Sequence, residues 1–226
     1  MTDNAVAREI AAQMVMVNAS EIALKDEGKY IRWVVELHPF RISQFVVTQE
    51  HYALIQGLTV GANDRQKPVV EVSWLEATEF CNLISRQAGL AESYSWDAEG
   101  IIACNWNSGG YRLPSEAEWE FACRAGSSEV RYGELDDIAW YSANSSLELH
   151  EVGLKKPNDF GLYDTIGNAW EWCWDIYDSE IYGEYRVFRG GGFSDPPRAC
   201  RASCRRKSHP TFKIDDLSFR LAQTMS

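Results

Sequence analysis

The sequence predicts an α+β domain in which loops take an unusually large share of the chain. Three observations support this class: strand-like alternation in the N-terminal part, two helices with capping signals near the middle, and a second half without a long amphipathic helix. No linker and no internal repeat interrupts the 226 residues. We therefore expect one domain over residues 1–226, long enough to bury its own core.

The first predicted strand runs from Ile31 to Leu37, where larger apolar residues recur at every second position. A second run of this kind, FRISQFVV, begins at Phe40. A period close to two is typical of a half-buried strand. Both segments are expected to form strands.

Two helices are indicated by the chemistry of their ends. Ser73 and Glu76 form a capping box, an apolar stripe follows, and Gly89 provides the stop. The segment SEAEWEFACRAG, from Ser115 to Gly126, repeats the pattern. A weaker helix is predicted over 48–56. Beyond Gly126, aromatic residues, glycines and short apolar runs predict short strands joined by long ordered loops.

Composition excludes several classes of partner. The net charge of −11 and a pI near 4.9 argue against nucleic acid and against anionic membrane surfaces. No apolar run is long enough for direct membrane insertion. The N-terminus carries Asp3 and Glu9 where a signal peptide needs basic residues, so we expect cytoplasmic residence. The sequence does not indicate an oligomeric state.

Cysteine and histidine spacing gives no metal motif. The six cysteines include no C-x-x-C pair, and the four histidines are scattered. Buried thiols are the expected role of the cysteines in a reducing compartment. Whether Cys123 and Cys204 pair cannot be read from their positions.

Basic residues outnumber acidic ones between Arg189 and Arg220, although the whole chain is acidic. Two interpretations stand. The arginines pair internally with buried carboxylates, which suits the fork of the guanidinium group. Alternatively, they form a locally cationic surface for a partner.

Five motifs, in order, carry a family resemblance: PVVEVSWLEATEFCN, GYRLPSEAEWEFACRAG, FGLYDTIGNAWEWCWD, RVFRGGGF and LSFRLA. Together they resemble the formylglycine-generating enzyme/sulfatase-modifying-factor domain from about Met14 to Ala222. The resemblance implies a C-type-lectin-like fold of that subtype, with two main helices on a small, twisted antiparallel sheet and long ordered loops.

The family that this chain resembles has branches with different activities, and each branch implies different site residues. The copper-dependent oxidases use two thiolates, and their positions fall here on Asp195 and Cys200. A carboxylate is a hard ligand that does not replace a thiolate on Cu(I). The iron branch needs a histidine triad that this chain lacks. We therefore expect no catalytic residue and no catalytic cofactor. A copper-dependent formylglycine-generating-type oxidase stays the alternative, and a non-catalytic role in maturation of a partner is a third possibility.

The segment 189–221 most resembles the variable proteins of diversity-generating retroelements. It matches their C-terminal loop without a gap. In that loop, positions encoded by AAC in the template are rewritten by adenine-directed mutagenesis. Every residue type found here at those positions is reachable from AAC by changing its adenines. The positions are Ser194, Asp195, Pro196, Ala199, Cys204, Arg206, Ser208, His209, Phe212, Ile214, Asp215 and Asp216.

This resemblance implies a non-enzymatic protein that binds a variable protein or peptide ligand. Phe193 and Phe212 are expected as exposed apolar anchors, and Asp216 as an exposed acceptor with its neighbour Asp215. Thr211 adjoins the variable positions, and Trp174 would form the floor of the surface. The alternatives are that Phe193 covers the sheet edge and that Trp174 packs in the core.

The family also has a calcium site whose ligands correspond to two side chains and two backbone carbonyls here. They fall on Asp164 and Glu171, and on Gly167 and Ala169. The resemblance thus implies at most one structural Ca²⁺, because hard oxygen ligands suit that ion. The alternative is that Glu171 bonds to arginine or to tryptophan N–H groups.

Overall fold

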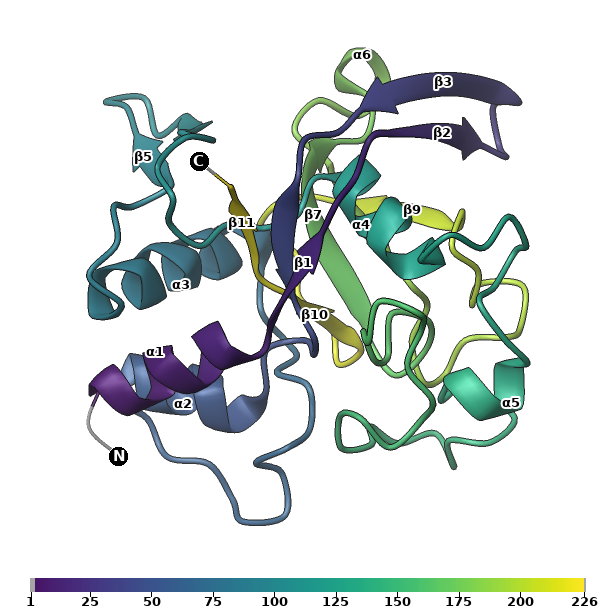
Figure 1. Cartoon of the computed structure of the whole chain (residues 1–226), viewed down its shortest axis with the longest axis horizontal. Coiled ribbons are helices and arrows are strands. Elements are labelled where there is room, and N and C mark those ends of the chain that lie inside the picture. The colour runs from purple at the N-terminus through teal and green to yellow at the C-terminus, as the bar shows by residue number, and fades with distance from the viewer. Residues whose placement is uncertain (1–2, 226) are drawn as a thin grey trace.

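The computed structural model describes residues 3–225 and has two sheets that lie near each other between groups of helices (Figure 1). The first sheet has the order β1 (Met14–Val17), β4 (Phe40–Ser43) and β11 (Ala222–Thr224). All its pairs are antiparallel. It therefore joins the two ends of the described chain.

The second sheet carries the C-terminal segment. Its order is β10 (Leu217–Phe219), β7 (Trp170–Ile176), β8 (Arg186–Arg189) and β9 (Arg205–Ser208). β10 runs parallel to β7, whereas the other pairs are antiparallel. The predicted variable segment thus contributes both edge strands of this sheet.

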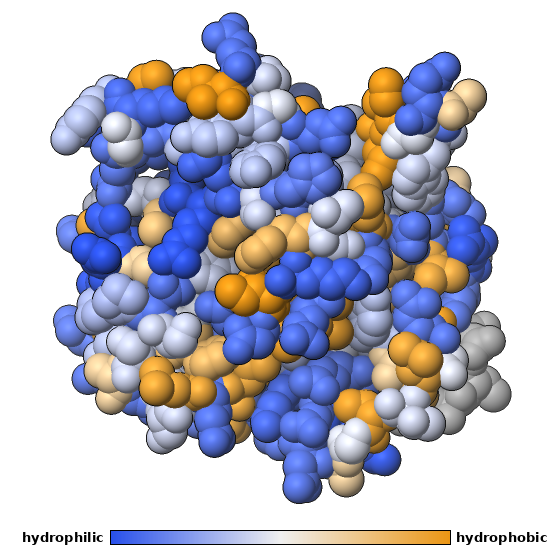
Figure 2. Space-filling view, turned by 180° about the vertical axis from the view of Figure 1, so that it is seen from behind, coloured by the Kyte–Doolittle hydropathy of each residue, from blue (hydrophilic) through white to orange (hydrophobic). Residues whose placement is uncertain are grey.

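Two further hairpins stand outside these sheets. One joins β2 (Glu21–Asp26) to β3 (Ile31–Glu36), and the other joins β5 (Tyr94–Trp96) to β6 (Ile102–Cys104). In Figure 2, apolar side chains reach the surface at the two projecting upper corners, where these hairpins lie. The predicted strand at 31–37 is therefore correct, and it pairs in a hairpin instead of a main sheet.

The capping signals placed the main helices correctly. They are α2 (Gln49–Gln56), α3 (Trp74–Gln87) and α4 (Glu116–Arg124). Both capping boxes are formed, with Ser73 and Ser115 accepting bonds from the third backbone N–H of their helices. The remaining helices are α1 (Asp3–Ala12) and the single-turn segments α5 (Leu135–Ile138) and α6 (Ser179–Tyr182).

Helix α1 was not predicted from the sequence. Its signal was present, because Val6, Ala7 and Ile10 share one helix face and are buried against α2 and α3. Within residues 3–225, no helix is long and apolar enough to cross a bilayer.

The main core lies between α3 and the second sheet. The apolar stripe of α3, which includes Phe80 and Ile84, is fully buried. Phe80 meets Phe219 of β10 edge-to-face at 5.4 Å between ring centroids. Trp74 donates from its indole N–H to the carbonyl of Cys173 in β7. Helix α3 therefore fixes one face of the second sheet, and α4 covers the other.

Candidate functional site

The C-terminal segment turns sharply after β8, at three consecutive glycines. Gly190 and Gly191 adopt φ angles of 106° and 88°, which favour glycine. A Cβ on Gly191 would lie 2.9 Å from Cys200 Sγ, and one on Gly192 would lie 2.3 Å from Asp216 Oδ2. The glycines therefore let the backbone pass directly against Cys200 and Asp216.

A layer of buried ion pairs holds this segment from below. Arg189 bonds to Glu120, and Arg205 forks onto Glu116 with N–O distances of 2.5 and 2.8 Å. Both glutamates project from α4. Burial alone lowers the pKa of Arg189, but the charges of Glu116 and Glu120 outweigh it and raise that pKa. The internal-pairing interpretation is thus confirmed for Arg189 and Arg205.

Arg220 completes the layer at the centre of the sheet. Its Nε and one terminal nitrogen donate to both oxygens of Glu171 at 2.5 and 2.6 Å. Trp119 Nε1 donates to the same carboxylate at 2.7 Å. Arg220, Glu171 and Trp119 are all almost fully buried. The guanidinium also donates to the carbonyls of Ser43 and Tyr163, so it ties β7 to the end of β4 and to the loop at Tyr163.

These contacts match the alternative assignment of Glu171. Both carboxylate oxygens already accept N–H donors, and the Arg220 guanidinium holds the place of a cation. The carbonyl of Gly167 accepts the backbone N–H of Ala169. The donor set therefore does not fit Ca²⁺ at Glu171, and calcium binding stays a prediction that this geometry disfavours.

Of the two predicted side-chain ligands for calcium, Asp164 has an unused oxygen. Its Oδ2 accepts the Gly153 N–H at 2.8 Å, and its buried Oδ1 has no partner. Burial raises the pKa of Asp164 to about 6. Within residues 3–225, no cluster of three or more acidic, histidine or cysteine side chains is arranged to hold a metal ion.

The two positions that correspond to the oxidase thiolates are occupied by groups unsuited to copper chemistry. Asp195 accepts N–H bonds from Trp170 Nε1 at 2.6 Å, from Gly192 at 3.0 Å and from Arg206 at 2.8 Å. Cys200 is fully buried, and burial raises the pKa of its thiol to about 12. A thiol with such a pKa is protonated near neutral pH and is a poor nucleophile. All six cysteines are free, Cys123 and Cys204 included.

The predicted variable positions divide into three groups by exposure. Four of the predicted ligand-binding residues are buried: Phe193, Asp195, Ala199 and Asp216. Cys204 and Ser208 are half-buried. The exposed residues, which we call the exposed C-terminal surface, are Ser194, Pro196, Arg206, His209, Thr211, Phe212, Ile214 and Asp215.

The expectation that Phe193 and Asp216 are exposed is wrong, since they are 8% and 7% exposed. Phe193 is held in the fold by its backbone, because its N–H donates to Asn168 and its carbonyl accepts the Ser145 hydroxyl at 2.7 Å. Asp216 lies against Gly192 in the glycine turn. Phe212 and Ile214 are 38% and 41% exposed, in agreement with the expectation for Phe212.

Neighbouring elements extend this surface in a way that the sequence analysis missed. Tyr185, just before β8, meets the His209 ring edge-on at 6.1 Å. The loop also bonds to the start of α3, where Leu75 N–H donates to the Pro210 carbonyl and Lys213 pairs with Glu76. No local motif marks Tyr185, because its place depends on the pairing of β8 with β9.

Trp174 belongs to an aromatic cluster beside this surface. Its ring lies 5.0 Å from Trp74 and 5.1 Å from Tyr94, and the Arg186 guanidinium lies 5.1 Å above it. The ring is half-buried and contacts the main core. Its role as a floor of the ligand surface stays a prediction.

We predict that Glu171→Gln destabilises the fold strongly. Removing the carboxylate charge leaves the buried Arg220 guanidinium without its counter-charge, a change that costs about 3–5 kcal/mol. Urea unfolding followed by circular dichroism measures the decrease in the free energy of unfolding. Asp137→Asn, which removes an exposed pair with Lys156, is the matched control and should change stability little. A loss no larger than that of the control would contradict the prediction, as would a Glu171→Gln/Arg220→Met double variant no better than the single one.

A second prediction concerns pH. Burial, with the charges of Asp195 and Asp215, raises the pKa of Asp216 to about 6. A raised carboxyl pKa means that the folded state holds this proton more tightly, so the group's contribution falls as pH rises from about 4 to about 6. Asp216→Asn should therefore gain stability relative to the parent over that range. Asp164 and Asp175, with pKa values also near 6, are present in both proteins and cancel in the comparison. The measurement is the free energy of unfolding of the variant and of the parent at several pH values. If the difference between the two proteins stays constant with pH, the raised pKa of Asp216 is refuted.

Comparisons with known proteins agree with this fold. Residues 3–225 match the family of the Sulfatase-modifying factor enzyme 1-like domain. The formylglycine-generating enzyme of Streptomyces coelicolor is 29% identical over 69% of this chain and 52% of its own length. The chaperone protein LppX of Paenibacillus barcinonensis is 29% identical over 70% of this chain and 71% of its own. This chain spans only 38% of another relative, the serine/threonine-protein kinase pkn1 of Chlamydia pneumoniae.

Among solved structures, Treponema denticola variable protein 1 superposes with a TM-score of 0.84 and 30% identity, over 94% of this chain and 95% of that one. CarF superposes with a TM-score of 0.80 and 25% identity, over 95% of this chain and 98% of that one. These similarities confirm the C-type-lectin-like architecture of the formylglycine-generating-enzyme subtype. The chain belongs to the sulfatase-modifying-factor family.

Proposed function

We propose that this protein is a non-catalytic binding protein that recognises a protein or peptide through the exposed C-terminal surface. One observation carries the proposal. Arg189, Arg205 and Arg220 are largely buried in ion pairs with α4 and β7, whereas His209, Phe212 and Ile214 face solvent. Apart from Arg206, which bonds to Asp195, and His209, which bonds to Thr211, the exposed side chains are thus separate from those that hold the loops.

The loop that presents this surface is ordered by its own contacts. His209 Nδ1 bonds to the Thr211 hydroxyl at 2.8 Å, and Phe212 N–H donates to the His209 carbonyl at 2.9 Å. Pro210 is buried and bonds to the start of α3. A preorganised loop loses less entropy on binding, which favours affinity.

The chemistry of the surface suits a protein or peptide ligand. Phe212, Ile214 and Tyr185 supply apolar contact, while His209, Arg206 and Asp215 supply hydrogen bonds and charge of both signs. Such mixtures of aromatic anchors and polar contacts are typical of recognition hot spots. No strong positive field accompanies them, since most nearby arginines are paired internally.

We further propose that a retroelement diversifies this surface. The residue types at the variable positions of 189–221, all reachable from AAC, and the likeness to Treponema denticola variable protein 1 support this proposal. Changes at the exposed positions would alter ligand contacts, and changes at the buried positions Asp195, Ala199 and Asp216 would alter the shape of the loop. A template copy of this segment, with adenines at the variable codons and an adjacent reverse transcriptase gene, is the genomic sign to look for.

Selection from a displayed random peptide library tests the binding function. We predict that peptides enriched on the parent lose at least about tenfold in affinity for Phe212→Ala, because anchor residues carry most of the binding energy. Ile101→Ala removes a 66% exposed apolar residue outside this surface and is the matched control. Binding that survives Phe212→Ala and His209→Ala alike would contradict the assignment of the surface.

The alternative to this proposal is the oxidase activity implied by the formylglycine-generating relatives, and an activity assay tests it. Incubation with copper, O₂ and a cysteine-containing peptide should yield no aldehyde, because Asp195 replaces a thiol and Cys200 stays protonated. Aldehyde formation that Cys200→Ser abolishes would overturn the proposal in favour of an oxidase.

A further inference from the structure

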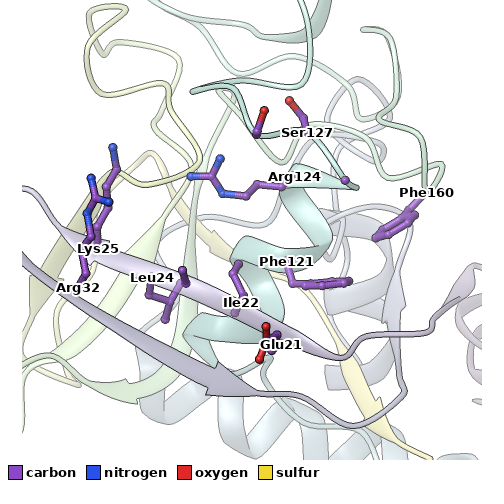
Figure 3. Close-up of a pocket in the computed structure, with 12 residues that line it drawn as sticks. Glu21, Ile22, Leu24, Lys25, Arg32, Phe121, Arg124, Ser127 and Phe160 are labelled. Carbon is purple, nitrogen blue, oxygen red and sulfur yellow. The ribbon is translucent and has the colours of Figure 1, made fainter.

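A groove lies along the free edge of β2, away from the C-terminal surface (Figure 3). Its volume is about 520 Å³. One wall is the strand itself, from Glu21 to Lys25, and the other is the end of α4 with residues 126–128. Phe121 and Phe160, whose rings stack at 6.1 Å, form an apolar end. The groove is therefore elongated along a strand and is partly apolar.

The backbone of β2 offers unused hydrogen bonds to this groove. Leu37 N–H donates to the Ser20 carbonyl, so the hydrogen-bonded pairs of the hairpin fall at every second residue from Ser20. The residues between them, Glu21, Ala23 and Lys25, direct their N–H and C=O groups to the opposite edge. Within residues 3–225, no backbone partner of these three residues is found on that edge. An open edge of this kind is a template for another strand.

Charges on the outer face of the hairpin are arranged unfavourably. Lys25 lies directly across from Arg32, and Glu21 lies directly across from Glu36. Like charges at opposed positions destabilise a hairpin. Lys25 has a partner in Glu27 at 2.9 Å, but Arg32, Glu21 and Glu36 have no ion-pair partner in the part of the chain that the structure describes. The face thus has a basic end, an acidic end, and Ala23 with the 64% exposed Val34 between them.

We propose that the β2 edge binds an extended peptide segment of a partner protein as a third, antiparallel strand. The segment carries an acidic residue opposite Lys25, a β-branched residue opposite Ala23 and a basic residue opposite Glu21. Its intervening side chains are apolar and point into the groove toward Phe121 and Phe160. Main-chain bonds supply affinity, and the charges at the two ends set register and direction. Antiparallel pairing is the more stable arrangement for a strand added at an edge.

The shape of the groove favours a peptide over a second copy of this chain. Arg124, Ser127 and Ser128 stand beyond the β2 edge on the face that α4 covers. An antiparallel pair of β2 strands from two copies would bring both α4 ends to the same face of the joint sheet. The two α4 ends would then crowd each other, whereas a lone extended segment brings no second α4 to that face.

The peptide EVTVK, acetylated, amidated and fluorescently labelled, tests the proposal by anisotropy at low salt. We expect KVTVE to bind about tenfold more weakly, because reversal places like charges opposite Lys25 and Glu21. Methylation of the backbone nitrogen of the central threonine, which faces Ala23, should also lower the affinity about tenfold or more. Methylation of the backbone nitrogen of the second residue, whose N–H faces solvent, should lower the affinity little. Exchange of the Ala23 and Lys25 amide hydrogens should slow when EVTVK binds.

Variants of the protein complete the test. Lys25→Glu, which places a like charge opposite the acidic end of the peptide, should remove the preference for EVTVK, and Arg65→Glu, which changes an exposed arginine elsewhere, should preserve it. Equal binding of the two peptides, or equal effects of the two methyl groups, would overturn the proposal. Protection of Ala23 that rises with protein concentration in the absence of peptide would overturn it in favour of self-pairing. Phe212→Ala should leave this binding unchanged, so the outcome is independent of the C-terminal surface.

Discussion

Buried arginine–carboxylate pairs between α4 and the second sheet determine how the C-terminal half of this protein is held. The strands there are short, and the loops between them lack the repeating hydrogen bonds of regular structure. Arg189, Arg205 and Arg220 supply many fixed donors in place of those bonds. Burying such charges is costly, and the cost is offset only because each guanidinium meets its carboxylate in close contact.

This arrangement separates the framework of the second sheet from most of its exposed positions. The framework side chains point inward to α4, β7 and the glycine turn, so they do not depend on what lies at the outer positions. At the position where the related oxidases need a thiolate, Asp195 instead bonds to Trp170, Gly192 and Arg206. Through these bonds Asp195 links β7, the glycine turn and β9.

Much of the fold was predictable from local chemistry, and the exposure of single side chains was not. The capping boxes at Ser73 and Ser115 located α3 and α4 because their signals lie within one helical turn. Helix α1 was missed although its apolar stripe was visible. The burial of Asp216 depends on its contact with Gly192, and that of Phe193 on backbone bonds to Asn168 and Ser145. These partners lie far apart along the chain, so residue spacing does not reveal them. The pairing of Arg220 with Glu171 joins residues on different strands and was foreseen only as an alternative to calcium.

The central claim is that the loops keep their structure when the exposed C-terminal surface changes. The most direct measurement is the melting temperature of a variant with Ser194, His209, Phe212, Ile214 and Asp215 all replaced by other residue types reachable from AAC. Arg206 is retained because it bonds to Asp195. The account predicts a melting temperature within about 5 °C of the parent, since exposed substitutions that break no buried contact each change stability little. A fall of more than about 10 °C would show that these side chains hold the fold and would contradict the account.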